Sequence, residues 1–460
     1  MDSTFGATRR TFLKHSGAVL LAGYAAARGT GLAQTVQRPN AEKYQSITLN
    51  THEFFGDIEE RFDFPKGWRV DVVGMAGKNA PALTGPQIVQ KLRSPINSKP
   101  LADIAGGKKT AAISFDDLTC PTPNGIIAEQ VINELNAAGI DDDHILFISA
   151  LGSHHVMTQP EARAKLGAVV DRCRWINHNV FHNFIEVGRT AWMNRVEVDA
   201  YFMKADLKIM LTGLRDHGSA CYTGGPKSLL PGLSSFQTIF FNYGIVGGYT
   251  KGRDGATENG NPTVTRTNLT TNDLRNDIID AARLAGIDFT VNTVYNGKRQ
   301  VIEVFAGDAV DAHLQACQYS VKNLCDEREV KTAEYDIVVA NSYPGIQTAG
   351  TSFIAPREGG SAVVISQNPL GLNPMHYVSE SRRLDVKASW DRFYTASAAK
   401  FDRLMLSQYM QRRDIASFTG LQLFPAWDTL LAVLEGKFKG AARVCVFPYN
   451  GIQHRPKTIA

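Results

Sequence analysis

The sequence predicts a mixed α/β protein with two domains, each built on a mostly parallel sheet, and with a cleft between them as the default site. Three observations support this prediction. Short β-rich runs alternate with helical stretches from residue 68 onward. The 460 residues are enough for two or three domains with ample cores. Hydrophobic residues make up 43% and charged residues 20%, which excludes collagen, wholesale disorder and coiled coil.

The first half of the chain carries the strand–helix–strand order of a parallel sheet. Short β-rich runs predict strands at 70–73, 110–114 and 144–150. Apolar residues at helical spacing predict a helix over 126–138, which ends before Gly139. Another apolar run, at 205–212, precedes a loop that is rich in glycine and in reactive side chains.

The alternation restarts after residues 251–271, whose Gly, Asn and Thr content predicts a linker or an excursion loop. The elements predicted after it are a helix at 273–286, a hairpin of 289–295 and 300–305 around Asn296-Gly297, a helix at 308–324, strands at 335–341, 361–366 and 443–447, and a largely helical tail at 389–440. We therefore expect an N-terminal catalytic domain over 61–270 and a C-terminal α/β domain over 271–460, preceded by an irregular leader at 34–60.

The N-terminus has the pattern of an export signal. Thr8–Lys14 contains adjacent arginines, residues 18–27 form a modest apolar run, and Gly31-Leu32-Ala33 offers small residues for cleavage. The alternative is a basic amphipathic helix. We expect residues 1–33 to be a twin-arginine signal peptide, which makes the twin-arginine translocase a partner and the periplasm or the exterior the destination. This route carries proteins that are already folded.

The charge balance and the cysteines exclude other classes. The chain carries a formal +4, and residues 1–33 hold four basic residues and one acidic residue, so the remainder is close to neutral. The sequence therefore offers no reason to expect nucleic acid as a partner. The sequence contains no uninterrupted run of eighteen apolar residues, so we do not expect a permanent membrane span. Six cysteines show no CxxC pair, and whether Cys120 and Cys221 form a disulfide stays open.

Three segments that follow predicted strands hold the densest set of reactive residues. The first, 114–123, includes Asp116, Asp117, Thr119 and Cys120 and then opens a helix. Such a helix N-terminus can bind an anion, although the same side chains can simply cap it. The second segment, 150–158, ends a strand in a glycine turn with His154 and His155. A histidine there can act as general acid or base, or can be a polar turn residue that faces water.

The third segment, 216–232, contains His217, Gly224, Gly225 and Lys227. The glycines allow a ligand to approach the backbone closely, and the lysine can pair with a phosphate or act as a nucleophile. The spacing of a P-loop is missing, so nucleotide hydrolysis is not expected. Two histidines on different loops with a lysine nearby suit chemistry on two faces of one carbon, as in a racemase.

Other patterns carry less chemistry. His178 and His182 have the i, i+4 spacing of a zinc pair, but no HExxH accompanies them, and we expect a structural or surface role. The sequence also lacks a GxSxG elbow and a GxGxxG fingerprint.

Taken in order, the three segments resemble the nickel-pincer lactate racemase family, whose members interconvert the stereoisomers of 2-hydroxy acids. The matching residues are Asp116–Pro123, Ala150–His155 and Asp216–Gly232. The resemblance implies that His154 and His217 are the two catalytic histidines, one on each side of the substrate's α-carbon. It also implies that Lys227 carries the nickel pyridinium dithiocarboxylate mononucleotide through a thioamide. Asp117, Thr119, Gly224 and Gly225 are expected around this cofactor.

The sequence departs from the family at three positions. Cys120 stands where the family has a substrate-binding arginine, and its loss removes a bidentate clamp for a carboxylate. Tyr243 stands where the family has a histidine ligand to nickel. A phenolate of Tyr243, or a thiolate of Cys120 or Cys221, could take the place of that ligand. Near Gly359-Gly360, where the family has a lysine, the chain has Gln347, Thr348 and Ser352.

These departures make simple racemisation of lactate improbable and leave three hypotheses. The first is an exported racemase or epimerase that acts on another 2-hydroxy acid or a sugar acid through the lysine-bound cofactor. The second is a periplasmic binding protein without the cofactor. The third is a different metalloenzyme that uses His217, Cys221 and Tyr243 around another ion.

Overall fold

The computed structural model describes residues 42–248, 261–345, 353–371, 400–412, 415 and 420–459. The predicted signal peptide, residues 251–260 of the predicted linker, and Gln347, Thr348 and Ser352 lie outside these residues. The chain divides into a small unit, residues 1–46 and 63–66, and a large unit, residues 47–62 and 67–460. In the small unit, the backbone N–H of Lys66 donates to the carbonyl of Lys43, and Gln45 donates to the carbonyl of Pro65 at 3.3 Å.

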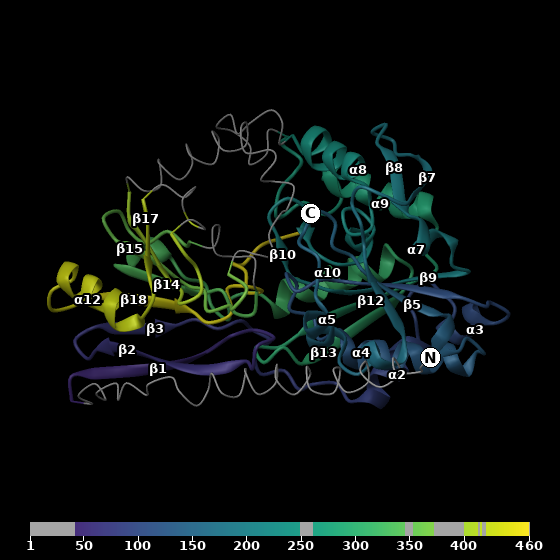
Figure 1. Ribbon diagram of the computed structural model, residues 1–460. Coiled ribbons are helices and arrows are strands. Elements are labelled where there is room, and N and C mark those ends of the chain that lie inside the picture. Colours follow the sequence, from purple (N-terminus) through teal and green to yellow (C-terminus); the bar gives the residue numbers. More distant parts are fainter. Residues whose placement is uncertain are drawn as a thin grey trace, which may run out of the picture. The chain divides into compact units, whose positions relative to one another are not determined.

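The first six-stranded sheet of the large unit is parallel except for one edge strand (Figure 1). Its order is β13 (Val301–Gly307), β12 (Phe289–Tyr295), β9 (Leu207–Gly213), β4 (Ala111–Phe115), β5 (Ile145–Ser149) and β6 (Arg174–Asn177). Strand β13 pairs antiparallel with β12 and confirms the predicted hairpin. The other neighbours run parallel, as the strand–helix–strand order predicts.

Apolar side chains cover both faces of this sheet because successive residues of a strand point to opposite sides. Ala111, Ile113 and Phe115 belong to one core, with α2 (Gly85–Arg93), α3 (Leu101–Ala105) and α4 (Asn124–Ala137). Ala112, Ile148 and Met210 belong to a second core, with α7 (Ala200–Lys204), α8 (Phe236–Phe240) and α9 (Asp273–Ala285). Helix α9 ends at Gly286, whose left-handed φ of 64° suits a helix terminus. The shorter helices α5 (Gln159–Leu166), α6 (Val169–Arg172) and η1 (Asp142–His144) lie between the strands β4, β5 and β6 in the chain.

The second six-stranded sheet is parallel throughout. Its order is β17 (Leu421–Phe424), β16 (Asp402–Leu406), β15 (Ser361–Ile365), β14 (Ile337–Asn341), β18 (Arg443–Phe447) and β3 (Arg69–Val72). Every residue of β14 and β15 is buried, which fits strands that are covered on both faces. Helix α12 (Trp427–Lys437) packs on β16 and β17, and η5 (Thr332–Glu334) precedes β14 in the chain, whereas α10 (Asp311–Asn323) packs on β12 and β13 of the first sheet.

The structure corrects two sequence predictions. The leader expected to be irregular at 34–60 forms β1 (Tyr44–Thr51) and the start of β2 (Ile58–Pro65), which pair in a two-stranded sheet. The tail expected to be largely helical contains the strands β16 and β17 in its described part, because β16 is buried in the second sheet and β17 pairs with it at the edge. The boundary at 270 stays a prediction, although each sheet takes strands from both sides of it.

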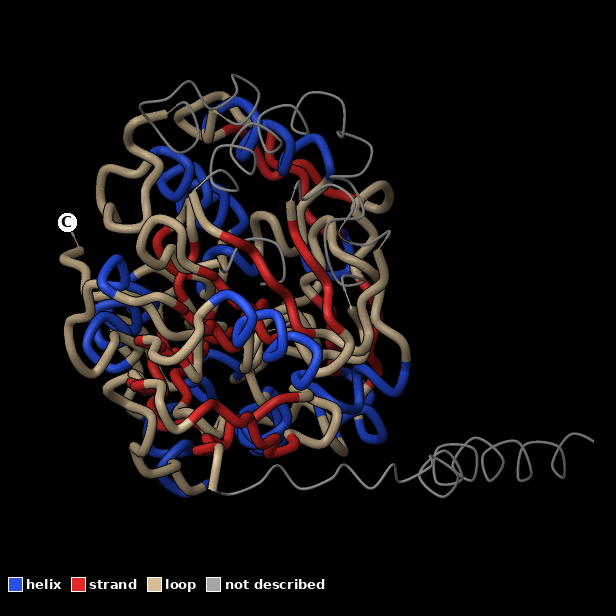
Figure 2. Tube along the Cα trace, turned by 90° about the vertical axis from the view of Figure 1, so that its left-hand side faces the viewer, coloured by secondary structure: helices blue, strands red, loops and turns tan. Residues whose placement is uncertain are grey.

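Figure 2 shows the strands in red among the helices in blue. Within the described ranges, the helices are too short or too polar to cross a lipid bilayer.

Candidate functional site

The carboxyl ends of four neighbouring strands of the first sheet bring the three reactive segments to one edge. In the parallel register, Phe115 of β4 lies opposite Ser149 of β5 and Leu211 of β9, and Gly213 of β9 lies opposite Thr293 of β12. The loops that follow these strands therefore start side by side, where open α/β sheets place their ligands.

Asp116 ties these loops together. Its carboxylate accepts hydrogen bonds from Thr122 Oγ1 at 2.6 Å, from Asn124 Nδ2 at 2.9 Å and from the backbone N–H of Gly213 at 3.0 Å. The buried ammonium group of Lys165 also donates to it, at 2.8 Å, and to the carbonyl of Cys120 at 2.8 Å. The loops after β4 and β9 are thus held in one arrangement together with the end of α5.

Asp117 orients His154. One oxygen of Asp117 lies 2.7 Å from His154 Nδ1, and the other accepts from the backbone and side chain of Thr119. Burial raises the pKa of Asp117, but the charge of His154 and the hydrogen bonds from His154 and Thr119 outweigh burial, so the pKa lies below its usual value. An ionised carboxylate only accepts hydrogen bonds, so Nδ1 of His154 carries a proton and Nε2 carries the lone pair of the neutral ring. His154 is therefore set up as a base at Nε2.

His217 has the opposite arrangement. It lies on β10 (Asp216–His217), which pairs with β11 (Cys221–Tyr222) in a short hairpin. Its Nδ1 accepts the backbone N–H groups of Ser219 at 3.2 Å and Ala220 at 3.1 Å. A ring nitrogen that accepts carries no proton, so Nε2 of the neutral ring is the N–H donor. His217 therefore presents a hydrogen-bond donor where His154 presents a base.

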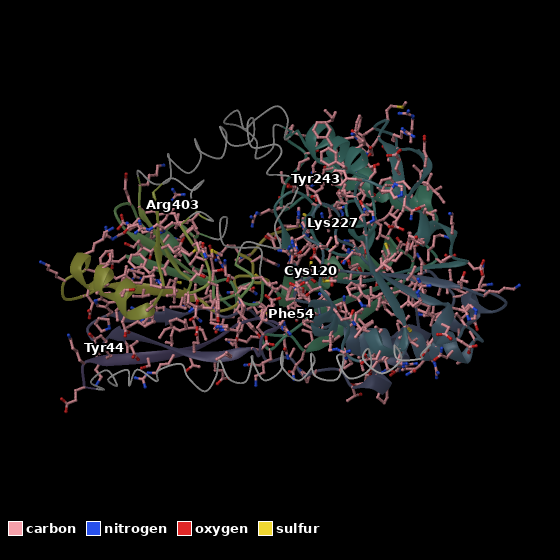
Figure 3. The ribbon with its side chains drawn as sticks, in the orientation of Figure 1. Tyr44, Phe54, Cys120, Lys227, Tyr243 and Arg403 are labelled. Atoms are coloured by element: carbon pink, nitrogen blue, oxygen red, sulfur yellow. The ribbon has the colours of Figure 1, made fainter. Side chains whose placement is uncertain are left out.

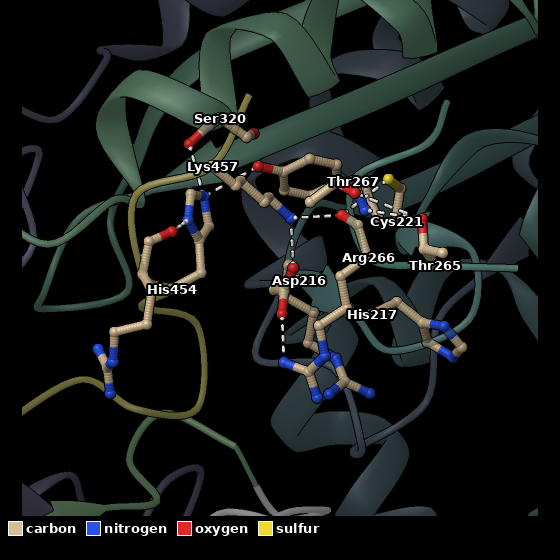
Figure 4. A network of polar contacts seen from close by, with 12 residues as sticks. Asp216, His217, Cys221, Thr265, Arg266, Thr267, Ser320, His454 and Lys457 are labelled. Carbon is tan, nitrogen blue, oxygen red and sulfur yellow. Dashed lines mark hydrogen bonds and ion pairs between the residues drawn. The ribbon is translucent and has the colours of Figure 1, made fainter. Parts of the chain in front are cut away.

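The C-terminal segment braces the hairpin that carries His217 (Figure 4). Asp216 is paired with Arg266 at 2.8 Å and with Lys457. His454 Nε2 lies 2.9 Å from the hydroxyl of Tyr222, whose ring also contacts the ammonium group of Lys457. The last described residues of the chain thus fix the position of a predicted catalytic residue.

Lys227 lies on a short 3₁₀ turn, η2 (Gly225–Ser228), next to the ends of β4 and β9. Gly224 and Gly225 have positive φ angles of 88° and 53°. A Cβ atom on Gly225 would lie 2.4 Å from His313 Cγ, so only glycine allows this close approach. The backbone N–H of Gly225 donates to Thr212 Oγ1 at 3.0 Å. Within the protein, these glycines position the turn that carries the lysine.

Lys227 and Tyr243 meet directly. Lys227 Nζ donates to the hydroxyl of Tyr243 at 2.6 Å. Tyr243 lies on a single π-helical turn, η3 (Phe241–Val246), a distortion often found at functional sites. Asn242 holds this turn on α9 through hydrogen bonds to Leu274 O at 3.0 Å and to Asp277 Oδ2 at 2.8 Å. The residue in place of the family's histidine ligand therefore reaches the lysine expected to carry the cofactor.

The lysine fits a covalent cofactor, whereas the tyrosine fits a metal only after it loses a proton. Burial lowers the pKa of Lys227 to about 7, and the charge of Arg215 acts in the same direction, so much of the amine is uncharged near neutral pH. An uncharged amine is the nucleophile that thioamide formation needs. Burial raises the pKa of Tyr243, which keeps the phenol protonated in the absence of a metal. Among the described residues, no three His, Cys, Asp or Glu side chains form a cluster that could hold a metal ion by themselves.

Cys120 lies beside an arginine that the sequence patterns did not single out. The side chain of Arg215 is buried close enough to the Cys120 thiol for its charge to act on the pKa of Cys120. Burial raises the pKa of Cys120, and the charge of Arg215 opposes that rise. A guanidinium group is thus present at the position where Cys120 replaces the family's arginine. The sequence could have indicated Arg215 by its position, two residues before His217.

Two further buried polar groups were also missed. Glu53 lies between β1 and β2, in the predicted leader, so nothing in the sequence indicated it. Tyr295 lies at the carboxyl end of β12 and is fully buried. In the view of Figure 3, the labelled residues Phe54, Cys120, Lys227 and Tyr243 lie one above another, from bottom to top in that order. The ammonium group of Lys165 links the first two, since it lies 5.1 Å from the Phe54 ring and bonds to Cys120 O.

The remaining sequence candidates have structural roles. His178 is buried, with Nδ1 3.0 Å from Asp199 and Nε2 3.0 Å from the carbonyl of Ser234, whereas His182 is exposed. All six cysteines are free thiols, so Cys120 and Cys221 form no disulfide. The Cys221 thiol donates to the carbonyl of Arg266 at 2.8 Å, and burial raises its pKa to about 12.

Comparisons with known proteins agree with this geometry. Residues 55–250 match the family model of the lactate racemase N-terminal domain. The lactate racemase of Thermoanaerobacterium thermosaccharolyticum is 25% identical over 327 residues, which are 68% of this chain and 73% of that protein. The lactate racemase of Lactiplantibacillus plantarum is 28% identical over 298 residues, 62% of this chain and 66% of that protein. These matches confirm the resemblance that the three segments predict.

Solved structures show the same fold. The lactate racemase apoprotein of T. thermosaccharolyticum superposes with a TM-score of 0.67 at 21% identity, over 89% of this chain and 99% of that one. A protein from Thermotoga maritima gives a TM-score of 0.58 at 17% identity, over 80% of this chain and 97% of that one. The predicted fold class is therefore confirmed.

The low pKa of Lys227 predicts unusual reactivity. In protein free of cofactor, we expect brief acetic anhydride treatment to acetylate Lys227 with a rate that rises through about pH 7, because the neutral amine is the nucleophile. Peptide mass spectrometry measures the rate, with the exposed Lys108 as reference. Labelling of Lys227 that begins only near pH 10 would contradict the environment described here.

Glu53 makes stability depend on pH. Burial raises its pKa from 4.5 to about 8, so between these values the folded state binds a proton that the unfolded state has lost. This contribution to the free energy of unfolding is complete below pH 4.5 and is lost as pH rises through 8. Glu53→Gln should therefore stabilise the protein relative to wild type at pH 9, by up to a few kcal/mol at about 1.4 kcal/mol per pKa unit, and change it little at pH 4.5. Urea unfolding measures this, with the exposed Glu59→Gln as the control, and an equal effect of both variants would disprove it.

Proposed function

We propose that this chain, a diverged member of the lactate racemase-like family, is a racemase or epimerase of a 2-hydroxy acid or sugar acid other than lactate. The observation that carries the proposal is the opposite hydrogen bonding of the two histidines. Nδ1 of His154 faces a carboxylate, and Nδ1 of His217 accepts two backbone N–H groups. One ring is thus prepared to take a proton and the other to donate a hydrogen bond.

In this proposal the two histidines have different roles at the oxygen of the 2-hydroxyl group. His154 Nε2 takes the proton of the 2-hydroxyl group, and Asp117 stabilises the imidazolium ion that forms. His217 Nε2–H donates a hydrogen bond to the same oxygen and polarises it as a neutral ring. His154 returns its proton when the hydroxyl group is restored. The pincer nucleotide of the family, when bound, supplies the acceptor and donor of the α-hydrogen as hydride.

Lys227 supports this proposal because its environment suits covalent attachment of that nucleotide. About half of its amine is uncharged near pH 7, and the amine donates a hydrogen bond to Tyr243. Tyr243 would be the protein ligand to nickel in its phenolate form, a role that requires the metal to displace the phenolic proton. The alternative of a different metalloenzyme has less support, because the thiol of Cys221, one of its expected ligands, donates to Arg266 O.

Export belongs to the same proposal. The twin-arginine pattern in residues 1–33 suits a protein whose cofactor is installed before translocation. The partners would then be the translocase and a small hydroxy acid in the periplasm or outside the cell.

The cofactor assignment predicts a modified lysine. Mature protein purified from its native host should carry about one nickel per chain and a mass excess confined to the peptide of Lys227. Intact mass, peptide mapping and metal analysis measure both, and Lys227→Ala should lose both while remaining folded. An unmodified lysine without nickel, in a host that makes the cofactor, would leave the binding-protein hypothesis in place of the enzyme.

The division of roles predicts unequal histidine variants. The assay is chiral chromatography of single enantiomers from a panel of 2-hydroxy acids. His154→Gln should lower turnover about 10²–10⁴-fold because the base is lost. His217→Gln should retain much more activity than His217→Ala, since the glutamine amide can replace the Nε2–H donor. Equal loss in both His217 variants would show that His217 must itself exchange a proton.

A further inference from the structure

Several buried polar atoms near Arg215 lack hydrogen-bond partners in the described part of the chain. They are both carboxyl oxygens of Glu53 and the hydroxyl oxygen of Tyr295. Arg299 comes only within 4.0 Å of Glu53, which is beyond hydrogen-bond distance. Glu53 is 3% exposed and Tyr295 is 0% exposed, so bulk water does not reach them freely. A buried polar atom without a partner typically costs about 1–3 kcal/mol, and native proteins keep few of them. A ligand that completes these hydrogen bonds would explain why they persist.

These atoms belong to the site at the sheet edge. Tyr295 follows Thr293, which lies opposite Gly213, and a Cβ atom on Gly213 would lie 2.9 Å from the Tyr295 ring. The charges of Arg215 and Glu53 both act on the pKa of Tyr295, and that of Arg215 acts on Glu53. Tyr295 therefore lies beside the segment that carries Arg215, and Glu53 is close enough for its charge to act on Tyr295; we call these three residues the polar group.

The backbone holds Glu53 in place at the cost of strain. His52, Phe54 and Asp57 have positive φ angles of 59°, 62° and 45°, which are unfavourable for residues with side chains. The segment is fixed at both ends, because His52 Nε2 lies 2.8 Å from the hydroxyl of Tyr409 and Asp57 accepts from Tyr343 at 2.9 Å. Strain of this kind persists where the surroundings enforce it, often at ligand sites.

Arg215 provides a positive charge near position 120, where the family pattern has an arginine and this chain has Cys120. Its side chain lies near the thiol of Cys120, and a carboxylate is a stronger acceptor for a guanidinium group than a thiol is. Arg215 lies two residues before His217, so both side chains start from the same short segment at the end of β9. A carboxylate on Arg215 would place the adjacent 2-hydroxyl carbon towards His217.

We propose that Arg215 binds the carboxylate of the substrate and that Glu53 and Tyr295 bind hydroxyl groups beyond its 2-hydroxyl. This inference rests on the proposed function and deepens it, because it assigns the substrate to the polyhydroxylated acids. A protonated carboxyl and a phenol each donate and accept, which is the pairing that a hydroxyl group requires. Lactate, whose remaining group is a methyl, would leave both side chains without partners.

The test compares Tyr295→Phe with a matched control, Tyr222→Phe, whose hydroxyl has a partner in His454. The probes are D-gluconate and L-lactate, with binding measured by calorimetry on the full mature chain and stability by thermal unfolding. Tyr295→Phe should unfold at the same or a higher temperature than wild type, whereas Tyr222→Phe should unfold at a lower one. Tyr295→Phe and Glu53→Gln should each bind D-gluconate at least tenfold more weakly and bind L-lactate as wild type does. Arg215→Gln should weaken binding of both probes.

Three results would overturn the proposal. The first is a loss of stability in Tyr295→Phe equal to that in Tyr222→Phe, which would reveal a structural partner such as an ordered water. The second is equal weakening of both probes in Tyr295→Phe and Glu53→Gln. The third is wild-type protein that binds D-gluconate no better than L-lactate. If Tyr295→Phe and Glu53→Gln weaken D-gluconate binding as expected but no tested acid is racemised, the polar group is a binding site and the proposed racemase function is wrong. If racemisation occurs and these variants leave it unchanged, only the polar group fails.

Discussion

The carboxylate of Asp116 is the contact on which the arrangement of the site depends. The parallel register of the first sheet delivers three loops to one edge, but register alone leaves each loop free to choose its path. Asp116 removes that freedom, since it accepts from the loop after β4, from the backbone at the end of β9 and from Lys165 on α5. The ion pair with Lys165 is well shielded from solvent, and removing either partner would leave a buried charge at a typical cost of about 3–5 kcal/mol. His154 precedes α5 in the chain and Lys227 follows β9, so this carboxylate connects segments that lead to both residues.

The sequence was informative where chemistry and periodicity act over short distances. The alternation of strands and helices, the hairpin at 289–307 and the edge carrying His154, His217 and Lys227 all follow from local patterns. The sequence was silent where the fold joins distant segments. Arg215 lies near Cys120 because β9 and β4 are neighbours in the sheet. The buried Glu53 belongs to a stretch that the sequence predicts to be an irregular leader. The strands β16 and β17 were missed because burial of β16 and the pairing of β17 with it, not local propensity, decide their conformation.

The positions at which the sequence departs from the family it resembles lie beside other polar groups of this chain. At position 120, where the family pattern has an arginine, Cys120 lies near Arg215, which belongs to the segment after β9. A tyrosine replaces the histidine at 243, and its hydroxyl still reaches the lysine amine on the neighbouring turn. The site also keeps Asp117, Thr119 and His154 hydrogen-bonded to one another, which is the arrangement that the proposed racemase or epimerase needs at its base.

Strand β3 affects how the molecule is made. Among the described residues it begins at Arg69 and pairs with β18 alone, which begins at Arg443. During synthesis this early strand has no partner until the 370 residues between it and β18 have been made, so its contact order is very high. Contacts that distant in sequence close slowly, and the exposed edge of the second sheet can pair with other chains until β3 and β18 come together. A molecule that stops before Arg443 lacks both β18 and the contacts of His454 and Lys457 with the hairpin that carries His217. The second sheet and the support of His217 therefore depend on the same late segment.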